Sequence, residues 1–121
     1  MTIRWVHAGL LEADLPSASF DLVSAQYPAL LATPGHDAER ALMSLVAPGG
    51  LLLVVHHAQV DAAHAQSQGF DPRDYVAPGD VAALLDDAWT LEVHETRPRS
   101  VTGGAGAHHR EDVVVRARRL R

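Results

Sequence analysis

The feature that most constrains the fold is an uninterrupted apolar run, Leu51–Val55. An apolar run without polar alternation is typical of a strand covered on both faces, as in a parallel sheet flanked by helices. It follows Ala47–Gly50, where Pro48 cannot continue a helix and two glycines permit backbone angles closed to other residues. The chain is therefore predicted to be α/β, with a helix that leads directly into a buried strand.

Hydrophobic periodicity places further elements on either side of this strand. Strands are predicted at Ile3–Val6, Phe20–Ala25, Trp89–Thr96 and Asp112–Arg118, and helices at His36–Val46 and Asp80–Asp87, the second with Asp80 as its N-cap. Loops are predicted at Gly9–Ser19 and Thr102–Ala107, whereas Asp61–Gly69 is compatible with a helix or a loop. The order of elements predicts parallel strands first and an antiparallel pair at the end.

Length and charge narrow the classes of protein. A chain of 121 residues forms one domain at most, and its net charge of -5 disfavours general nucleic-acid binding. Alternation of Arg116 and Arg118 predicts a solvated strand face. The absence of cysteine excludes disulfides and thiolate chemistry. With no signal-peptide pattern and no apolar run long enough to span a bilayer, the expected location is the cytoplasm, with no membrane partner.

Three segments, taken together and in order, resemble the middle of class I S-adenosylmethionine (SAM)-dependent methyltransferases. They are Trp5–Leu11, Phe20–Ala25 and Ala47–Val55. In that family the third strand is followed by a Phe-Asp-Leu-Val fourth strand and then by a Pro-Gly-Gly turn that opens the fifth. The final antiparallel strand pair also suits the family. The resemblance implies a partial Rossmann-like sheet, with residues 1–121 forming a single domain that is the C-terminal portion of this fold.

The resemblance also implies where SAM would bind, since ligands of open α/β sheets lie beyond the carboxyl ends of the strands. Residues after the first strand would approach the adenine, and residues after the second would approach the methionine part. The implied cofactor-binding residues are Gly9, Leu10, Ser24, Ala25 and Gln26. In the family, an acidic residue after the third strand usually accepts a hydrogen bond from the adenine amine. This chain has Gly9 at that position, and the nearby Glu12 and Asp14 are candidate substitutes.

The third strand end, at His56-His57, would face a small-molecule acceptor. His56 is the candidate general base, with His57 as an alternative, and Tyr27 is similarly placed. His108 and His109 precede the last strand and could reach the same side. No metal site is predicted, because neighbouring histidines on a strand point to opposite faces. A serine hydrolase is not predicted either, because the chain contains no Gly-x-Ser-x-Gly turn to carry its nucleophile.

The glycine-rich SAM loop of the family should precede the segments found here, and the chain does not contain it before Met1. The chain alone is therefore expected to bind SAM poorly or not at all. Without the strands that would flank it, Phe20–Ala25 is expected to present an open apolar edge. This favours a homo-oligomer or association with the missing N-terminal half. The alternative to a methyltransferase is an inactive remnant that acts as a dimerising or regulatory binding module.

Overall fold

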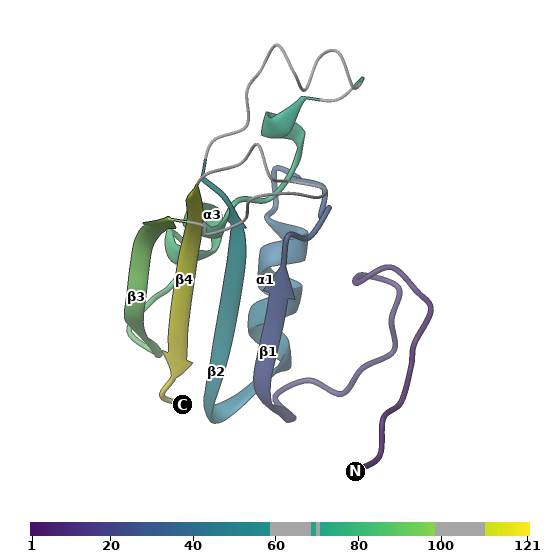
Figure 1. The fold of residues 1–121 in the computed structure, drawn as a ribbon. Coiled ribbons are helices and arrows are strands. Elements are labelled where there is room, and N and C mark those ends of the chain that lie inside the picture. Colours follow the sequence, from purple (N-terminus) through teal and green to yellow (C-terminus); the bar gives the residue numbers. More distant parts are fainter. Residues whose placement is uncertain (59–68, 70, 99–110) are drawn as a thin grey trace.

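A computed structural model describes residues 1–58, 69, 71–98 and 111–121 of the chain. Its sheet consists of β1 (Phe20–Gln26), β2 (Val46–His57), β3 (Trp89–Pro98) and β4 (Glu111–Arg119), in the order β1-β2-β4-β3 (Figure 1). β1 and β2 are parallel, and β4 is antiparallel to both of its neighbours. The predicted α/β class and the antiparallel pair at the end of the chain are confirmed.

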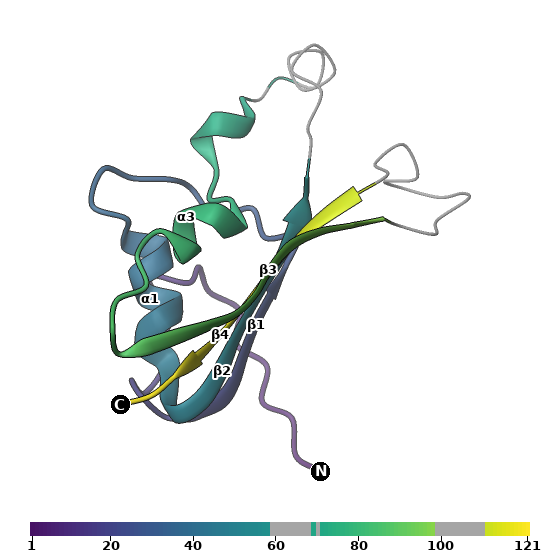
Figure 2. The same cartoon turned by 90° about the vertical axis from the view of Figure 1, so that its left-hand side faces the viewer.

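The helices α1 (Asp37–Leu45) and α3 (Pro78–Ala82) both cover one face of this sheet, as the edge-on view in Figure 2 shows. Alternate residues of β2 and β4 point to that face and are fully buried there, among them Leu52, Val54 and Val115. Leu52 and Val54 pack with Leu42 of α1 and Val81 near the end of α3 in one core. Burial of each such side chain stabilises the fold by about 1.5–3 kcal/mol.

The opposite face of the sheet carries no helix within the described residues (Figure 2). Leu51 and Leu53 of β2 point there and are only partly buried, and Leu22 of β1 is 57% exposed. The expectation that the Leu51–Val55 strand is covered on both faces is therefore met on one face only. The remaining side presents apolar side chains to solvent.

The turn predicted at Ala47–Gly50 lies inside β2. Phe20 of β1 pairs with Val46, but Leu22 already pairs with Leu51, so the four intervening residues of β2 loop out of the ladder. Gly49 makes this excursion possible with φ of 84°, a left-handed conformation that favours glycine. The strand thus starts earlier than Leu51–Val55 predicts, because Val46 already pairs with Phe20 of β1.

The predicted helix at His36–Val46 is confirmed as α1, and it contains the one charged side chain buried in the described core. Glu39 is 1% exposed. Its carboxylate lies 2.9 Å from Nδ1 of His36, the residue that precedes the helix in a left-handed conformation. A buried carboxylate is costly without a partner, so this contact stabilises the start of α1.

The strand predicted at Ile3–Val6 is wrong. Residues 1–9 contain no strand and are exposed, with Trp5 at 89%, and the N-terminal segment runs apart from the sheet in Figure 1. A strand requires a neighbour to pair its backbone groups, and none of the described strands lies beside this segment. The predicted loop at Gly9–Ser19 is confirmed, and Leu10 within it packs against the core.

The second predicted helix, Asp80–Asp87, is shorter and begins earlier, at Pro78. Ala77 is the N-cap, and the carboxylate of Asp80 accepts a hydrogen bond of 2.8 Å from the Ala77 amide. Asp80 therefore caps the helix from inside its first turn, and not as the N-cap residue. Residues 61–68 and 102–107, assigned above to a helix or loop and to a flexible connection, lie outside the described residues.

Candidate functional site

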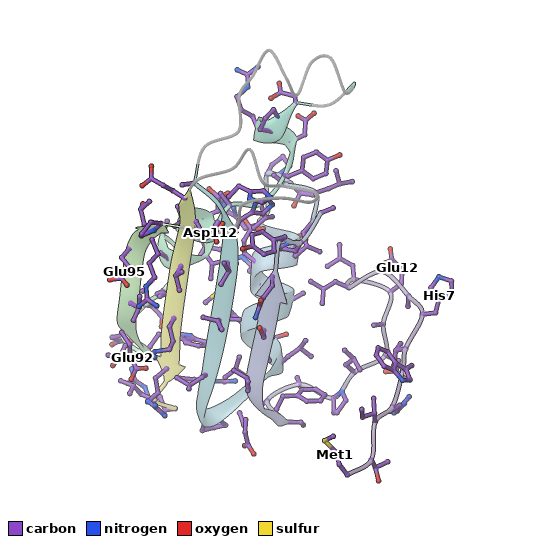
Figure 3. All side chains as sticks on the ribbon, viewed as in Figure 1. Met1, His7, Glu12, Glu92, Glu95 and Asp112 are labelled. Carbon is purple, nitrogen blue, oxygen red and sulfur yellow. The ribbon has the colours of Figure 1, made fainter. Side chains whose placement is uncertain are left out.

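The carboxyl ends of β1 and β2 meet at one edge of the sheet because the two strands are parallel. Tyr27 directly follows β1, and His56 and His57 end β2. β4 runs the other way, so that its beginning lies at the same edge and Asp112 pairs with His57. Figure 3 shows Asp112 at this end of the sheet, where side chains from three strand ends gather.

Tyr27 turns the chain sharply at the end of β1. Its φ is 51°, a left-handed conformation that is uncommon for a bulky residue and costs about 1–3 kcal/mol. Two contacts hold it there: its amide donates to the Val55 carbonyl at 2.8 Å, and its hydroxyl donates to Oδ2 of Asp112 at 2.8 Å. The strained turn places the tyrosine ring against the end of β2.

His57, Asp112 and Tyr27 form one cluster. Nδ1 of His57 lies 3.7 Å from Oδ1 of Asp112, a distance at which charges attract but which exceeds a hydrogen bond. The His57 and Tyr27 rings are 4.7 Å apart and tilted by 30°. The side chains of His57 and Asp112 are only 19% and 14% exposed, so their interaction is less screened than one on the surface.

Both ring nitrogens of His56 contact backbone groups. Nδ1 accepts a hydrogen bond of 2.8 Å from the His57 amide, and Nε2 lies 3.2 Å from the Pro28 carbonyl. A neutral imidazole offers one acceptor and one donor, and these two contacts use both. The geometry therefore gives His56 a role in holding the strand end against the chain after β1.

The opposite wall of the site is the segment around the 3-10 helix η1 (Pro72–Asp74). Backbone hydrogen bonds of 2.8 Å join it to the chain after β1, from Val76 to Leu30 and from Ala32 to Asp74. Leu31 and Tyr75 form an isolated antiparallel bridge at the same place. This short pairing fixes the distance between the two walls.

Between these walls lies a cleft of about 510 Å³. Its lining is aromatic and apolar, with a few polar groups: Tyr27, Pro28, Ala29, His56, His57, Ala58, Pro72, Tyr75, Val76 and Ala77. A concave apolar cavity with convergent polar groups at strand carboxyl ends is the usual form of a small-molecule site in α/β proteins. The cleft is thus the candidate site among the described residues.

An ion pair stabilises the rim of the cleft at η1. Asp71 accepts hydrogen bonds from the Arg73 amide at 2.9 Å and from its guanidinium at 2.8 Å. The guanidinium bond first, and then the backbone bond, hold the pKa of the Asp71 carboxyl below its usual range. The carboxylate is therefore charged at neutral pH and caps the turn that carries the wall.

The predicted site residues fall into three groups. Tyr27 and His56 line the cleft. Ser24, Ala25 and Gln26 end β1 just before it, where the Gln26 amide donates to the Ser24 hydroxyl at 3.3 Å. Gly9 and Leu10 lie on the N-terminal segment, and neither lines the cleft. In Figure 3 the neighbouring side chains of His7 and Glu12 point away from the sheet.

Sequence reasoning missed two residues that the fold brings to the site. Asp112 was assigned to a strand without a role. Tyr75 ends Asp61–Tyr75, the segment that the resemblance implies as a specificity loop, but no role was given to Tyr75 itself. Asp112 had one usable signal, because the first residue of a strand antiparallel to β2 reaches the carboxyl end of β2. For Tyr75 the only signal was its place in that segment, since its position in the site depends on the bridge to Leu31.

The chain resembles known proteins in its fold and not in its sequence. No protein-family model and no curated protein matches the chain. Two solved structures of the N-methyltransferase NodS from Bradyrhizobium japonicum WM9 do match it, at TM-scores of 0.62 and 0.63. The chain shares its fold with a methyltransferase. The second NodS structure is a complex with S-adenosyl-l-homocysteine (SAH).

The likeness covers 97% of this chain but 60% and 54% of the two NodS chains, at 18% and 19% identity. This chain therefore spans a little more than half the length of those structures. Identity at this level shows a common fold and does not transfer a site. Among the described residues, no helix has the length and apolar character needed to cross a membrane.

The described residues fit SAM only in part. The cleft supplies rings and apolar walls, and Ser24 and Gln26 supply polar atoms at the end of β1. The lining contains no carboxylate for ribose hydroxyls and no glycine-rich turn at a helix start. As a set, these residues do not complete a SAM site.

Proposed function

We propose that the chain is the C-terminal part of a SAM-dependent methyltransferase with a partial Rossmann-like sheet, and that its cleft receives a small-molecule acceptor. The observation that carries the proposal is the position of the cleft, at the carboxyl ends of β1 and β2 in a methyltransferase-like fold. SAM, when bound, would supply the methyl group. The remaining parts of its site would come from outside the described residues.

In this proposal the residues of the cleft hold and orient the acceptor. Tyr27 and His57 form one wall, and Tyr75 lies on the other. Asp112 fixes the Tyr27 hydroxyl, and the contacts of His56 with backbone groups fix the strand end. Orientation of two reactants accounts for a large share of the rate of such transfers, so rigid walls are what this reaction needs.

The test is SAH release from SAM by the natural gene product, offered small-molecule amines, alcohols and thiols. We expect transfer to one of these classes, and a fall in kcat/KM of about tenfold or more for His57→Ala, because a wall of the site is lost. His94→Ala, at an exposed histidine of β3 outside the cleft, is the matched control and should leave the rate unchanged. Absence of SAH release with every acceptor would contradict the proposal.

The open face of the sheet favours a second function, that of a methyltransferase-like binding module without activity. Leu22 and the outward side of β2 offer an apolar surface next to the edge strand β1. A protein that associates through this surface and releases no SAH would fit the second function and not the first.

A further inference from the structure

The N-terminal segment has the side-chain pattern of a strand, but no described strand lies beside it. Ile3–Val6 alternates in character, and the side chains of Ile3, Trp5 and Val6 are all exposed. In Figure 3, Met1 lies on a part of the chain that stands away from the sheet. Apolar side chains that are exposed together mark a surface for association. The segment is therefore a candidate to pair with a strand elsewhere.

The outer edge of β1 pairs with no strand that the structure describes. β2 is its one hydrogen-bonded neighbour in the described sheet, so the backbone groups on the other side of β1 point outward. Proteins protect such edges with proline, with lysine or with a covering segment. β1 contains neither proline nor lysine, and its one charged residue is Asp21. The edge is thus a template for a further strand.

The two segments match each other position by position. In a parallel alignment, three positions join apolar to apolar residues and one joins opposite charges. The pairs are Ile3 with Phe20, Arg4 with Asp21, Trp5 with Leu22, and Val6 with Val23. An antiparallel alignment that also joins Arg4 to Asp21 would place Val6 at Ser19, before the start of β1. The parallel register is the one that keeps all four residues on the strand.

This pairing does not suit two segments of the same molecule. Within one chain, parallel strands need a crossover of about a dozen residues or more, which is usually a helix. Residues 7–19 join the two segments here and form turns but no helix. Leu10, in the middle of this connection, is held against the core. The pairing is therefore expected between two copies of the chain.

We propose that two copies of the chain exchange their N-terminal segments, so that Ile3–Val6 of each adds as a parallel strand to the outer edge of β1 in the other. Exchange in both directions closes a twofold dimer. In it Trp5 lies beside Leu22 on the open face of the sheet, and Arg4 faces Asp21. The dimer goes beyond the proposed function, because it involves neither the cleft nor methyl transfer.

The first experiment is cross-linking between two single-cysteine variants of the full chain, which has no cysteine of its own. Arg4→Cys is mixed with Asp21→Cys under mild oxidation, and a tag on one chain identifies the mixed disulfide. The matched control mixes Arg4→Cys with Gln26→Cys, at the other end of β1. We expect about tenfold or more mixed disulfide with Asp21→Cys, because association holds those two thiols at a high effective concentration.

Equal yields from the two mixtures would overturn the exchange. A chain that carries both Arg4→Cys and Asp21→Cys separates exchange from pairing within one molecule. At high dilution it should form little disulfide, since a disulfide requires Cα atoms within about 7 Å of each other. Efficient closure inside the single molecule at high dilution would show that the segment pairs with its own β1, and would contradict the proposal.

A charge exchange tests the register. Arg4→Asp and Asp21→Arg should each raise the dissociation constant of the dimer by about fivefold, because a pair of opposite charges becomes a pair of like charges. The double variant, Arg4→Asp with Asp21→Arg, should restore association. Light scattering measures all four chains, and circular dichroism checks their folding. A double variant as weak as the single ones, or single variants without effect, would overturn the register.

Trp5 reports whether the N-terminal segment takes part in association. The chain has two tryptophans, so Trp89→Phe leaves Trp5 as the one that emits. Its fluorescence should move to shorter wavelength as the protein concentration rises, because a strongly exposed indole becomes covered at the dimer interface. A dimer in which this emission stays that of an exposed indole would associate without the segment, and would contradict the exchange.

Discussion

Two adjacent glycines in β2 are required for different reasons. Gly49 has a φ of 84°, and a Cβ built there meets no atom within 4 Å, so its requirement is backbone conformation. A Cβ on Gly50 would lie 2.9–3.0 Å from three carbonyl oxygens, those of Ala47, Asp21 and Phe20. Gly50 is therefore required for the close approach of β1 to the looped segment of β2, since backbone oxygens cannot move aside as a flexible side chain does.

This difference predicts unequal costs for the same substitution. Gly50→Ala should lower the free energy of unfolding by about 2 kcal/mol or more, because overpacking forces the backbone of β1 and β2 apart. Gly49→Ala should cost only about 1 kcal/mol, the penalty of a left-handed conformation for alanine. Urea denaturation of both variants measures the two values. Equal losses would show that the close contacts at Gly50 are relieved at little cost.

At the level of elements, η1 illustrates how a very short helix is held in place. Three residues cannot form a stable helix alone. The turn is fixed by Asp71 in front of it, by the Arg73 ion pair, and by the backbone bridge from Tyr75 to Leu31. All of these contacts support one wall of the cleft.

The lowered pKa of Asp71 predicts how this wall responds to acid. A carboxyl whose pKa is depressed in the folded protein stabilises it above the pKa of the unfolded chain, and this contribution is lost as the pH falls through the lowered folded pKa. The turn should therefore stay ordered at mildly acidic pH and loosen only in strong acid. NMR titration of the Arg73 amide, which donates to Asp71, follows this directly. In Asp71→Asn the amide signal should lose this titration.

A network of charged side chains joins β3 and β4 on the open face of the sheet. Glu92 of β3 accepts hydrogen bonds from Arg116 at 3.1 Å and from Arg118 at 3.0 Å, both on β4. Arg118 also donates to the Gly49 carbonyl at 3.0 Å. These contacts give the β3 and β4 side of the face a charged surface around Glu92, as the alternation of arginines predicts.

For the whole molecule, the decisive feature is a sheet covered on one side. β1 is an edge strand of the described sheet, and its outward side chain Leu22 is 57% exposed beside Leu51. An apolar face next to an unpaired edge favours association with another polypeptide. We propose that a second copy of the chain occupies this surface.

The corresponding prediction is concentration-dependent self-association of residues 1–121 in light scattering. Leu22→Glu should shift the population toward monomer, because a carboxylate in the apolar contact would lose its hydration. Leu120→Glu near the chain end, where Leu120 is 51% exposed, is the control and should not. A clean monomer at high protein concentration, before any substitution, would contradict the proposal.

Local sequence patterns predicted most of the strands and helices that contribute buried side chains. Phe20–Ala25 and Leu51–Val55 lie within observed strands, and His36–Val46 contains α1, because an apolar period reveals which face of a segment is buried. The sequence also placed Tyr27 and His56 at strand carboxyl ends, where the cleft is found. The strand prediction at Ile3–Val6 was wrong. The sequence pattern there is that of a strand, but no partner strand is present among the described residues.

Only the tertiary structure decided how distant residues meet. Tyr27 and Asp112 are 85 residues apart, and their hydrogen bond exists because β4 runs antiparallel to β2 and begins where β2 ends. The same pairing places a carboxylate behind the rings and leaves His56 bound to backbone groups. Local pattern determined which segments could become strands, because burial period is a property of neighbouring residues. Strand pairing determined the site, because hydrogen bonds between strands depend on partners that no local pattern specifies.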